Sequence, residues 1–114
     1  MRMVLSIIKP YKLDDVREEL EDVGVLGVTV MEVKGCGRTE GHTELYRGAE
    51  YVVDFLPKVL IMVLVSDAIS EKVKETISKF ARTGKHGDGI IWDIGFDEYT
   101  RISTEEIVND LQYK

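Results

Sequence analysis

Two short glycine-rich segments carry the residue types most suited to chemistry in this chain of 114 residues. Residues 84–89 read GKHGDG, and residues 35–38 read GCGR. Glycine lets successive backbone N–H groups point the same way, and such a nest of donors binds anions. Nearby lysine and arginine add positive charge, and arginine can hold a phosphate through two hydrogen bonds. Each segment is therefore a candidate anion site, with an ordinary glycine turn as the alternative interpretation.

Other reactive side chains form no recognisable catalytic or metal pattern. Residues 84–89 are not a P-loop, because G-x-x-x-x-G-K-[ST] is absent. The spacing of Cys36, His42 and His86 matches no zinc-site pattern. We therefore interpret them as polar loop residues, with a metal site as the alternative. There is no nucleophile-elbow or triad layout, and Asp88 is the one candidate general base beside the glycines. We expect the protein not to be an enzyme.

The glycine segments adjoin stretches with clear secondary-structure signals. Apolar, β-branched runs predict four strands, at residues 2–8, 25–33, 59–65 and 90–96. Gly27 is expected to form a bulge or a close backbone approach within the second strand. Apolar residues at helical spacing predict amphipathic helices over residues 13–23 and 67–80, the first capped by Gly24.

A capping box predicts one more helix near the C-terminus. Ser103 and Glu106 have the required spacing, and Ile107 and Leu111 would share one face of the short helix that follows.

The order strand, helix, strand, long connection, strand, helix, strand predicts one α+β domain over residues 1–114. It is the split βαβ, ferredoxin-like plan (βαββαβ), with both helices on one face of an antiparallel sheet. The first and third strands are apolar on both faces, so the other sheet face needs a cover, and a symmetric oligomer supplies one. The connection from Lys34 to Lys58 is long enough to predict a function, against the alternative of a mobile hairpin tip.

Composition excludes several classes of protein. The formal net charge of −6 argues against nucleic-acid binding. No apolar run approaches the roughly 20 residues that a membrane-spanning helix needs. The single Cys36 and a start that runs directly into a strand lead us to expect a cytoplasmic protein without membrane insertion.

Four stretches together resemble the PII-type nitrogen-regulatory signal proteins. They are VLSIIKPYKLDDVREEL (4–20), the pattern VKG-GR-GH-ELYRGAEY (33–51), FLPK (55–58) and TGKHGDG (83–89). The resemblance extends to about residue 104. It implies a ferredoxin-like homotrimer that binds ATP or ADP competitively in three inter-subunit clefts. The family's T-loop would span about residues 37–55, its B-loop about 82–90, and its C-terminal segment 101–114.

The resemblance also implies an effector and partners. Many members of the family sense 2-oxoglutarate together with Mg-ATP. The T-loop then docks on a regulated protein, such as an ammonium transporter, a nitrogen-assimilation enzyme or a nitrogenase regulator.

Position by position, the resemblance assigns roles to individual residues. The implied nucleotide contacts are Ile7, Thr29, Gly35, Gly37, Arg38, Leu64, Gly87, Asp88, Gly89 and Arg101. Thr39 and Lys58 stand at positions linked to 2-oxoglutarate, and Tyr51 stands at the family's modified tyrosine. No protein side chain is implied as a dedicated metal ligand.

Three positions depart from the family pattern. Thr39 replaces a glutamine that helps hold metal and 2-oxoglutarate, which argues against 2-oxoglutarate sensing. Ile90 and Ser103 each replace a basic residue near the phosphates, so the expected outcomes are weaker nucleotide binding, a shift toward ADP or AMP, or loss of binding. The alternative is a diverged PII-like trimer that binds another small anion or a metal ion.

Overall fold

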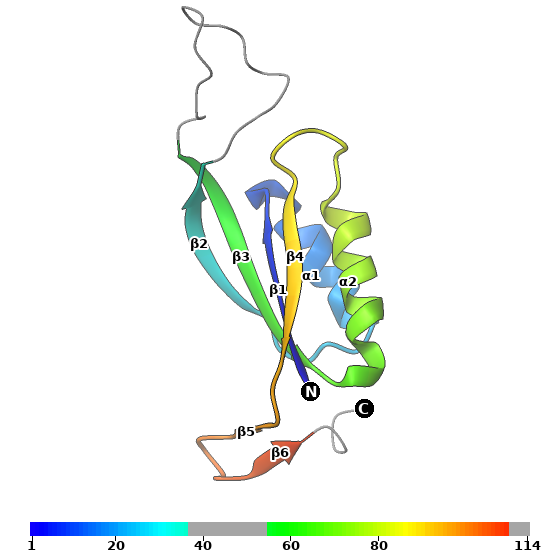
Figure 1. Cartoon of the computed structure of the whole chain (residues 1–114), viewed down its shortest axis with the longest axis vertical. Helices are drawn as coiled ribbons and strands as arrows, with labels where there is room; N and C mark the ends of the chain where they lie inside the picture. Colours follow the sequence, from blue (N-terminus) through cyan, green and yellow to red (C-terminus); the bar gives the residue numbers. More distant parts are fainter. Residues whose placement is uncertain (37–54, 110–114) are drawn as a thin grey trace, which may run out of the picture.

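The computed structural model describes residues 1–36 and 55–109. Its elements are β1 (Arg2–Ile8), the 3-10 turn η1 (Pro10–Lys12), α1 (Leu13–Asp22), β2 (Thr29–Gly35), β3 (Leu56–Val65), α2 (Asp67–Ala81), β4 (Gly89–Gly95), β5 (Glu98–Thr100) and β6 (Ile107–Asn109). Four strands form an antiparallel sheet in the order β2-β3-β1-β4. Both helices lie against one face of this sheet, as Figure 1 shows. The ferredoxin-like prediction is confirmed. Neither α1 nor α2 is long and apolar enough to cross a membrane.

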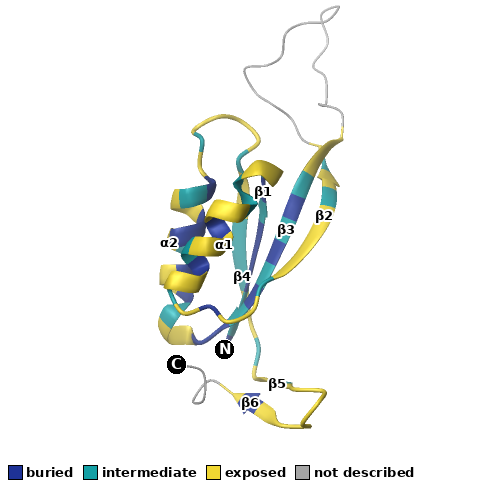
Figure 2. Cartoon of the chain, turned by 180° about the vertical axis from the view of Figure 1, so that it is seen from behind, coloured by how far each residue is buried: buried dark blue, intermediate teal, exposed yellow. Residues whose placement is uncertain are grey.

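The core lies between the helices and the sheet. Alternate residues of β1 and β3 point toward the helices, and each helix turns one apolar stripe to meet them, since side chains repeat every two residues in strands and every three or four in helices. The ribbon in Figure 2 is dark blue where residues are buried, on strands and helices that face each other. The cluster includes Val4, Ile8, Val16, Leu20, Ile61, Val63, Val73 and Ile77, each at most 1 % exposed.

The predicted second strand begins too early. β2 starts at Thr29 rather than at Val25, because the preceding residues complete the end of α1. Gly24, at φ +97°, donates to the Glu21 carbonyl at 3.0 Å, and Val25 donates to the Leu20 carbonyl at 3.0 Å. This pair of bonds is a Schellman cap, and Val25 packs into the core beside Leu20.

The same correction removes the bulge expected at Gly27. This glycine lies before β2, and a Cβ added to it would meet nothing within 4 Å.

Strands β2 and β3 reach further toward the long connection than predicted. β2 continues to Gly35, and β3 already begins at Leu56, paired with it. Lys58 therefore belongs to a strand, although the sequence placed it at the end of a loop. The rest of the predicted T-loop, residues 37–54, lies outside the described residues.

The predicted C-terminal helix is wrong, because residues 107–109 form strand β6 paired with β5. The chain reverses between these strands through two backbone bonds: Glu105 donates to the Arg101 carbonyl, and Arg101 donates to the Glu106 carbonyl, both at 2.8 Å. The Thr104 hydroxyl oxygen accepts the Glu106 N–H at 3.2 Å. Ser103 thus lies in a turn, not at a helix cap, and Leu111 is outside the described residues.

The sheet face opposite the helices is apolar, and no helix of the described chain covers it. β1, β3 and β4 each turn a second set of large side chains to this side, and β2 adds Met31. We call it the open face and define it by Met3, Leu5, Ile7, Met31, Leu60, Met62, Leu64, Ile90, Trp92 and Ile94. Exposed fractions are 63 % for Ile90, 54 % for Met31 and 49 % for Ile94.

Candidate functional site

A glycine-rich loop connects the end of α2 to the start of β4 and forms the most structured part of the candidate site. Gly84, Gly87 and Gly89 have φ values of +84°, +86° and +108°. L-residues rarely adopt such angles, which explains why the loop uses glycine at these positions. The loop stands at one end of the sheet, beside the end of β1 (Figure 1), because Gly89 pairs with Ile8.

The carboxylate of Asp88 closes this loop. Its Oδ2 accepts the backbone N–H of Thr83 at 2.9 Å and of Gly84 at 2.8 Å. Its Oδ1 accepts the Thr83 hydroxyl. Partial burial alone would raise the pKa of Asp88, but the hydrogen bonds from Thr83, Gly84 and Lys9 lower this pKa well below its usual range. Asp88 is therefore a charged acceptor at neutral pH.

Two lysines from other strands reach the loop. Lys9, at the end of β1, lies 3.1 Å from Asp88 Oδ1 and donates to the Thr83 hydroxyl at 3.2 Å. Lys58, near the start of β3, donates to the carbonyl oxygen of Gly87. The loop is thus bound to β1 and β3 by cationic side chains, and the base of the long connection is joined to the glycine loop.

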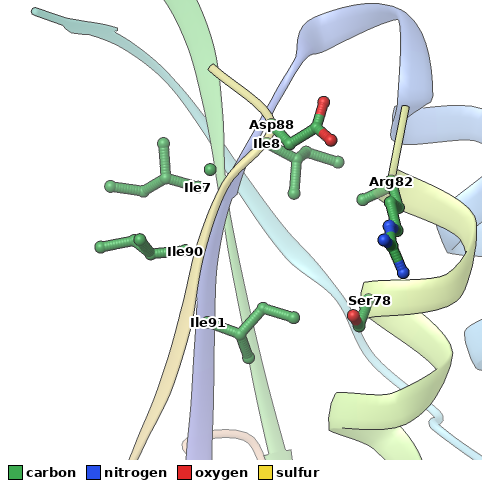
Figure 3. Close-up of a pocket in the computed structure, with 9 residues that line it drawn as sticks. Ile7, Ile8, Ser78, Arg82, Asp88, Ile90 and Ile91 are labelled. Carbon is green, nitrogen blue, oxygen red and sulfur yellow. The ribbon is translucent and has the colours of Figure 1, made fainter. Parts of the chain in front are cut away.

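A small cavity of about 110 Å³ lies beneath the loop, lined by residues that include Ile7, Ile8, Arg82, Asp88 and Ile90. In Figure 3 Ser78 and Arg82 approach from the helix side, while Ile7 and Ile90 lie on the other side of the strands. Its lining is mostly apolar, with Arg82 as its one basic residue. The basic residue expected after the GDG sequence is absent, and the side chain of Ile90 is exposed instead.

A second hollow of about 430 Å³ lies at the other end of the sheet. It is lined by Thr29, Leu64 and Arg101, three of the predicted contacts, together with Leu26, Gly27, Val28, Met62 and Tyr99. The Arg101 guanidinium lies 5.8 Å from the ring centroid of Tyr99 and 3.8 Å from a Glu106 carboxylate oxygen. An apolar wall with one arginine suits a flat ring that carries an anionic group.

The predicted nucleotide contacts in the described part of the chain therefore form two separate groups. The loop group contains Ile7, Gly35, Gly87, Asp88 and Gly89, while the hairpin group contains Thr29, Leu64 and Arg101. Strand register places them at opposite ends of the sheet, since Ile7 pairs with Ile90 whereas Leu64 pairs with Met3. Gly37, Arg38, Thr39 and Tyr51 lie outside the described residues.

Comparison with known proteins identifies the family. The family model described as nitrogen regulatory protein P-II matches residues 1–106. The chain belongs to this family. Proteins named nitrogen regulatory protein P-II from Rhodospirillum rubrum and Azospirillum brasilense are 54 % and 55 % identical over 106 residues. Nitrogen regulatory protein P-II 1 from Escherichia coli K12 is 57 % identical over 106 residues. Each match covers 93 % of this chain and 95 % of the relative.

The structure brings two residues into the site that were not predicted from the sequence, either from local patterns or from the resemblance to the P-II family. Lys9 and Thr83 flank Asp88, and sequence reasoning assigned neither a role. One signal was available for each. Lys9 follows the strand that pairs with the start of β4, and Thr83 and Asp88 bracket the glycine loop, as residues that bond to loop amides often do.

The metal alternative gains no support from the residues in view. Across residues 1–36 and 55–109 there is no group of three or more His, Cys, Asp or Glu side chains suited to a metal ion. Cys36 is exposed after β2, His86 lies on the glycine loop, and His42 is outside the described residues.

Proposed function

We propose that this protein is a homotrimeric regulator that binds an adenine nucleotide between its subunits and controls a partner protein through residues 37–55. The observation that carries the proposal is the separation of the two site groups. One group offers a glycine loop with backbone donors, held in place by two lysines, and the other offers an apolar hollow with Arg101. Neither group alone is a complete nucleotide site, whereas the loop group of one subunit and the hairpin group of its neighbour together are.

The open face supports the assembly that this requires. A monomer would leave Met31, Ile90 and Ile94 about half exposed, and burying a large apolar side chain gains about 1.5–3 kcal/mol. Contact through this face would also hold both site groups near a subunit boundary, since Ile90 and Leu64 belong to the face and adjoin opposite groups.

Among the described residues, the phosphate end of the site lacks the basic residue expected after the GDG sequence. Lys9 and Lys58 already bond to the loop itself, and Ile90 is apolar. Each added phosphate gains less here than it would in a cation-rich site. We therefore expect the affinity for ADP or AMP, compared with that for ATP, to be higher than in a cation-rich site. No catalysis is proposed, because the Asp88 carboxylate is occupied by Thr83 and Gly84 and is not placed to act as a base.

Calorimetry with ATP, ADP, AMP and 2-oxoglutarate, together with sedimentation analysis, tests the proposal. We expect a trimer that binds at least one adenine nucleotide. A stable monomer at micromolar concentration, or the absence of binding to all three nucleotides, would contradict it. In the latter case, titration with inorganic anions and divalent metals, using Cys36→Ala/His86→Ala as the metal control, tests the diverged alternative.

Sharing of the site between subunits has its own test. Arg101→Ala should disable the hairpin group, and Gly87→Trp should block the loop group. A mixture of the two variants, unfolded and refolded together, should regain nucleotide binding in about one cleft in four, because some clefts then combine two intact groups. A site contained within one subunit would regain none.

A further inference from the structure

We propose that Lys9 and Asp88 are positioning residues: their ion pair, completed by Thr83, orders the glycine loop so that its backbone amides can receive an anion. This inference rests on the proposed function for the identity of the ligand. It concerns the ligand-free protein as well, because the contacts that carry it exist within one protomer.

Both oxygens of the Asp88 carboxylate are engaged by neighbouring residues. The carboxylate therefore acts on the loop itself rather than as a ligand for a metal ion or a bridging water. It accepts two backbone N–H groups and one hydroxyl and lies 3.1 Å from Lys9 Nζ. Thr83 extends the network, since its hydroxyl oxygen also accepts the Lys85 N–H and the Lys9 ammonium, each at 3.2 Å. Side chains from β1 and from both ends of the loop thus hold residues 83–88 in one ring.

The charge of Asp88 makes Lys9 necessary. An uncompensated carboxylate beside a loop that receives an anion would repel that anion, and Asp88 is ionised at neutral pH. Lys9 neutralises this charge from the side of β1. Water screens the pair only in part, because the Lys9 side chain is 18 % exposed and the Asp88 side chain is 24 % exposed. With its one carboxylate occupied, the loop can offer an anion the backbone N–H groups that Asp88 and Thr83 do not take.

The neighbouring lysine offers a matched control. Lys12 lies one turn further along the chain, and its ammonium is 5.8 Å from the ring centroid of Tyr11 rather than at the loop. Lys12→Met therefore removes the same charge from the same part of the chain without touching the network. Lys9→Arg keeps the charge and can restore the ion pair, whereas Lys9→Met cannot.

Amide hydrogen exchange of the ligand-free protein tests the ordering of the loop. In Lys9→Met, exchange at Thr83, Gly84 and Lys85 should become about tenfold faster, as expected for loss of a charge-assisted bond. Lys9→Arg should recover most of the protection, and Lys12→Met should match the unaltered protein. Thr83→Val gives a second route to the same loss if Lys9→Met does not fold. Unchanged exchange in both Lys9→Met and Thr83→Val would overturn the proposal.

Calorimetry with adenosine, ADP and ATP tests the link to anion binding. Lys9→Met should weaken ADP and ATP by about tenfold and leave adenosine unchanged, and Lys9→Arg should restore the difference. An equal loss for adenosine would mean that Lys9 acts only through general stability, which would overturn the anion link. If the unaltered protein binds no adenine nucleotide, the proposed function fails, and the exchange measurement alone decides the role of Lys9 and Asp88.

Discussion

A Cβ atom at Gly89 would lie 1.6 Å from the carbonyl oxygen of Ile7 and 2.7 Å from its carbonyl carbon. The first residue of β4 therefore approaches the backbone of β1 more closely than any other amino acid permits. Its φ of +108° adds a second reason, because L-residues rarely adopt it. The contact is between two backbones, so no side-chain rotation can relieve it. Gly89 fixes where the glycine loop ends and the sheet begins.

Gly89→Ala should consequently be among the most damaging single substitutions in the protein. Backbone overlap and an unfavourable φ together should lower the free energy of unfolding by more than about 3 kcal/mol, measured by urea denaturation. Gly84→Ala is the control, because that glycine also has a positive φ but a Cβ there meets nothing within 4 Å. It should cost only about 1 kcal/mol. Equal effects for the two variants would contradict the role assigned to the Ile7 contact.

The sequence was most informative where local pattern and global fold agree. β1 and α1 lie where apolar periodicity predicted them, and Gly24 caps α1. Prediction failed where one residue could serve two structures. Val25 is as suited to a strand as to the end of a helix cap, and only its packing beside Leu20 decides between them.

The C-terminal error has a similar cause. Ser103 and Glu106 satisfy a capping pattern, but the alternation of exposed Ile107, buried Val108 and exposed Asn109 follows a strand period. Three residues are too few for a period to outweigh a capping motif. Only pairing with Tyr99 across the hairpin distinguishes the two structures.

The candidate site was predictable as a set of loops but not as a set of contacts. The glycine segment 84–89 was recognised from backbone chemistry alone. Lys9 was not, because its contact with Asp88 depends on the register between β1 and β4, which no local pattern encodes.

A charge on the open face should prevent oligomerisation. Ile94→Asp would place a carboxylate among apolar side chains, and burying it in a subunit interface would be strongly unfavourable. We expect a monomer by sedimentation, with Trp92, the single tryptophan of the chain, showing red-shifted fluorescence because it lies on the same face. Ala68→Asp adds the same charge to an exposed position on α2 and should leave the assembly intact. An Ile94→Asp protein that remains oligomeric would place the interface elsewhere.

Stability should fall in acid through Asp88. Its folded-state pKa is lowered below the unfolded value, so its contribution is complete above about pH 4 and is lost as the pH falls further toward the folded value. Asp88→Asn should therefore cost about 1–3 kcal/mol at pH 7, and the difference from the unaltered protein should shrink between about pH 4 and pH 2.

Two points sharpen that measurement. Asp93 acts in the same direction, because a hydrogen bond from Arg2 lowers its pKa, so the Asp88→Asn variant should keep part of the acid sensitivity. Asp97→Asn alters an exposed carboxylate and controls for the loss of one negative charge. A constant gap between Asp88→Asn and the unaltered protein at all pH values would contradict the role of ionised Asp88.

Glu105 stands in the turn of the β5–β6 hairpin with φ 60°, a left-handed angle for a residue that carries a Cβ. Such a conformation costs about 1–2 kcal/mol for an L-residue, and glycine avoids most of it while losing some entropy on folding. Glu105→Gly should therefore stabilise the hairpin by about 0.5–1 kcal/mol, seen as slower amide exchange over residues 98–109. Glu105→Ala removes the same charge but keeps the Cβ, so it should reproduce none of this gain. Equal protection in the two variants would show that charge, not backbone strain, limits the hairpin. The hairpin holds Arg101 against the second hollow, so the glycine variant should also show how far hairpin stability limits nucleotide affinity.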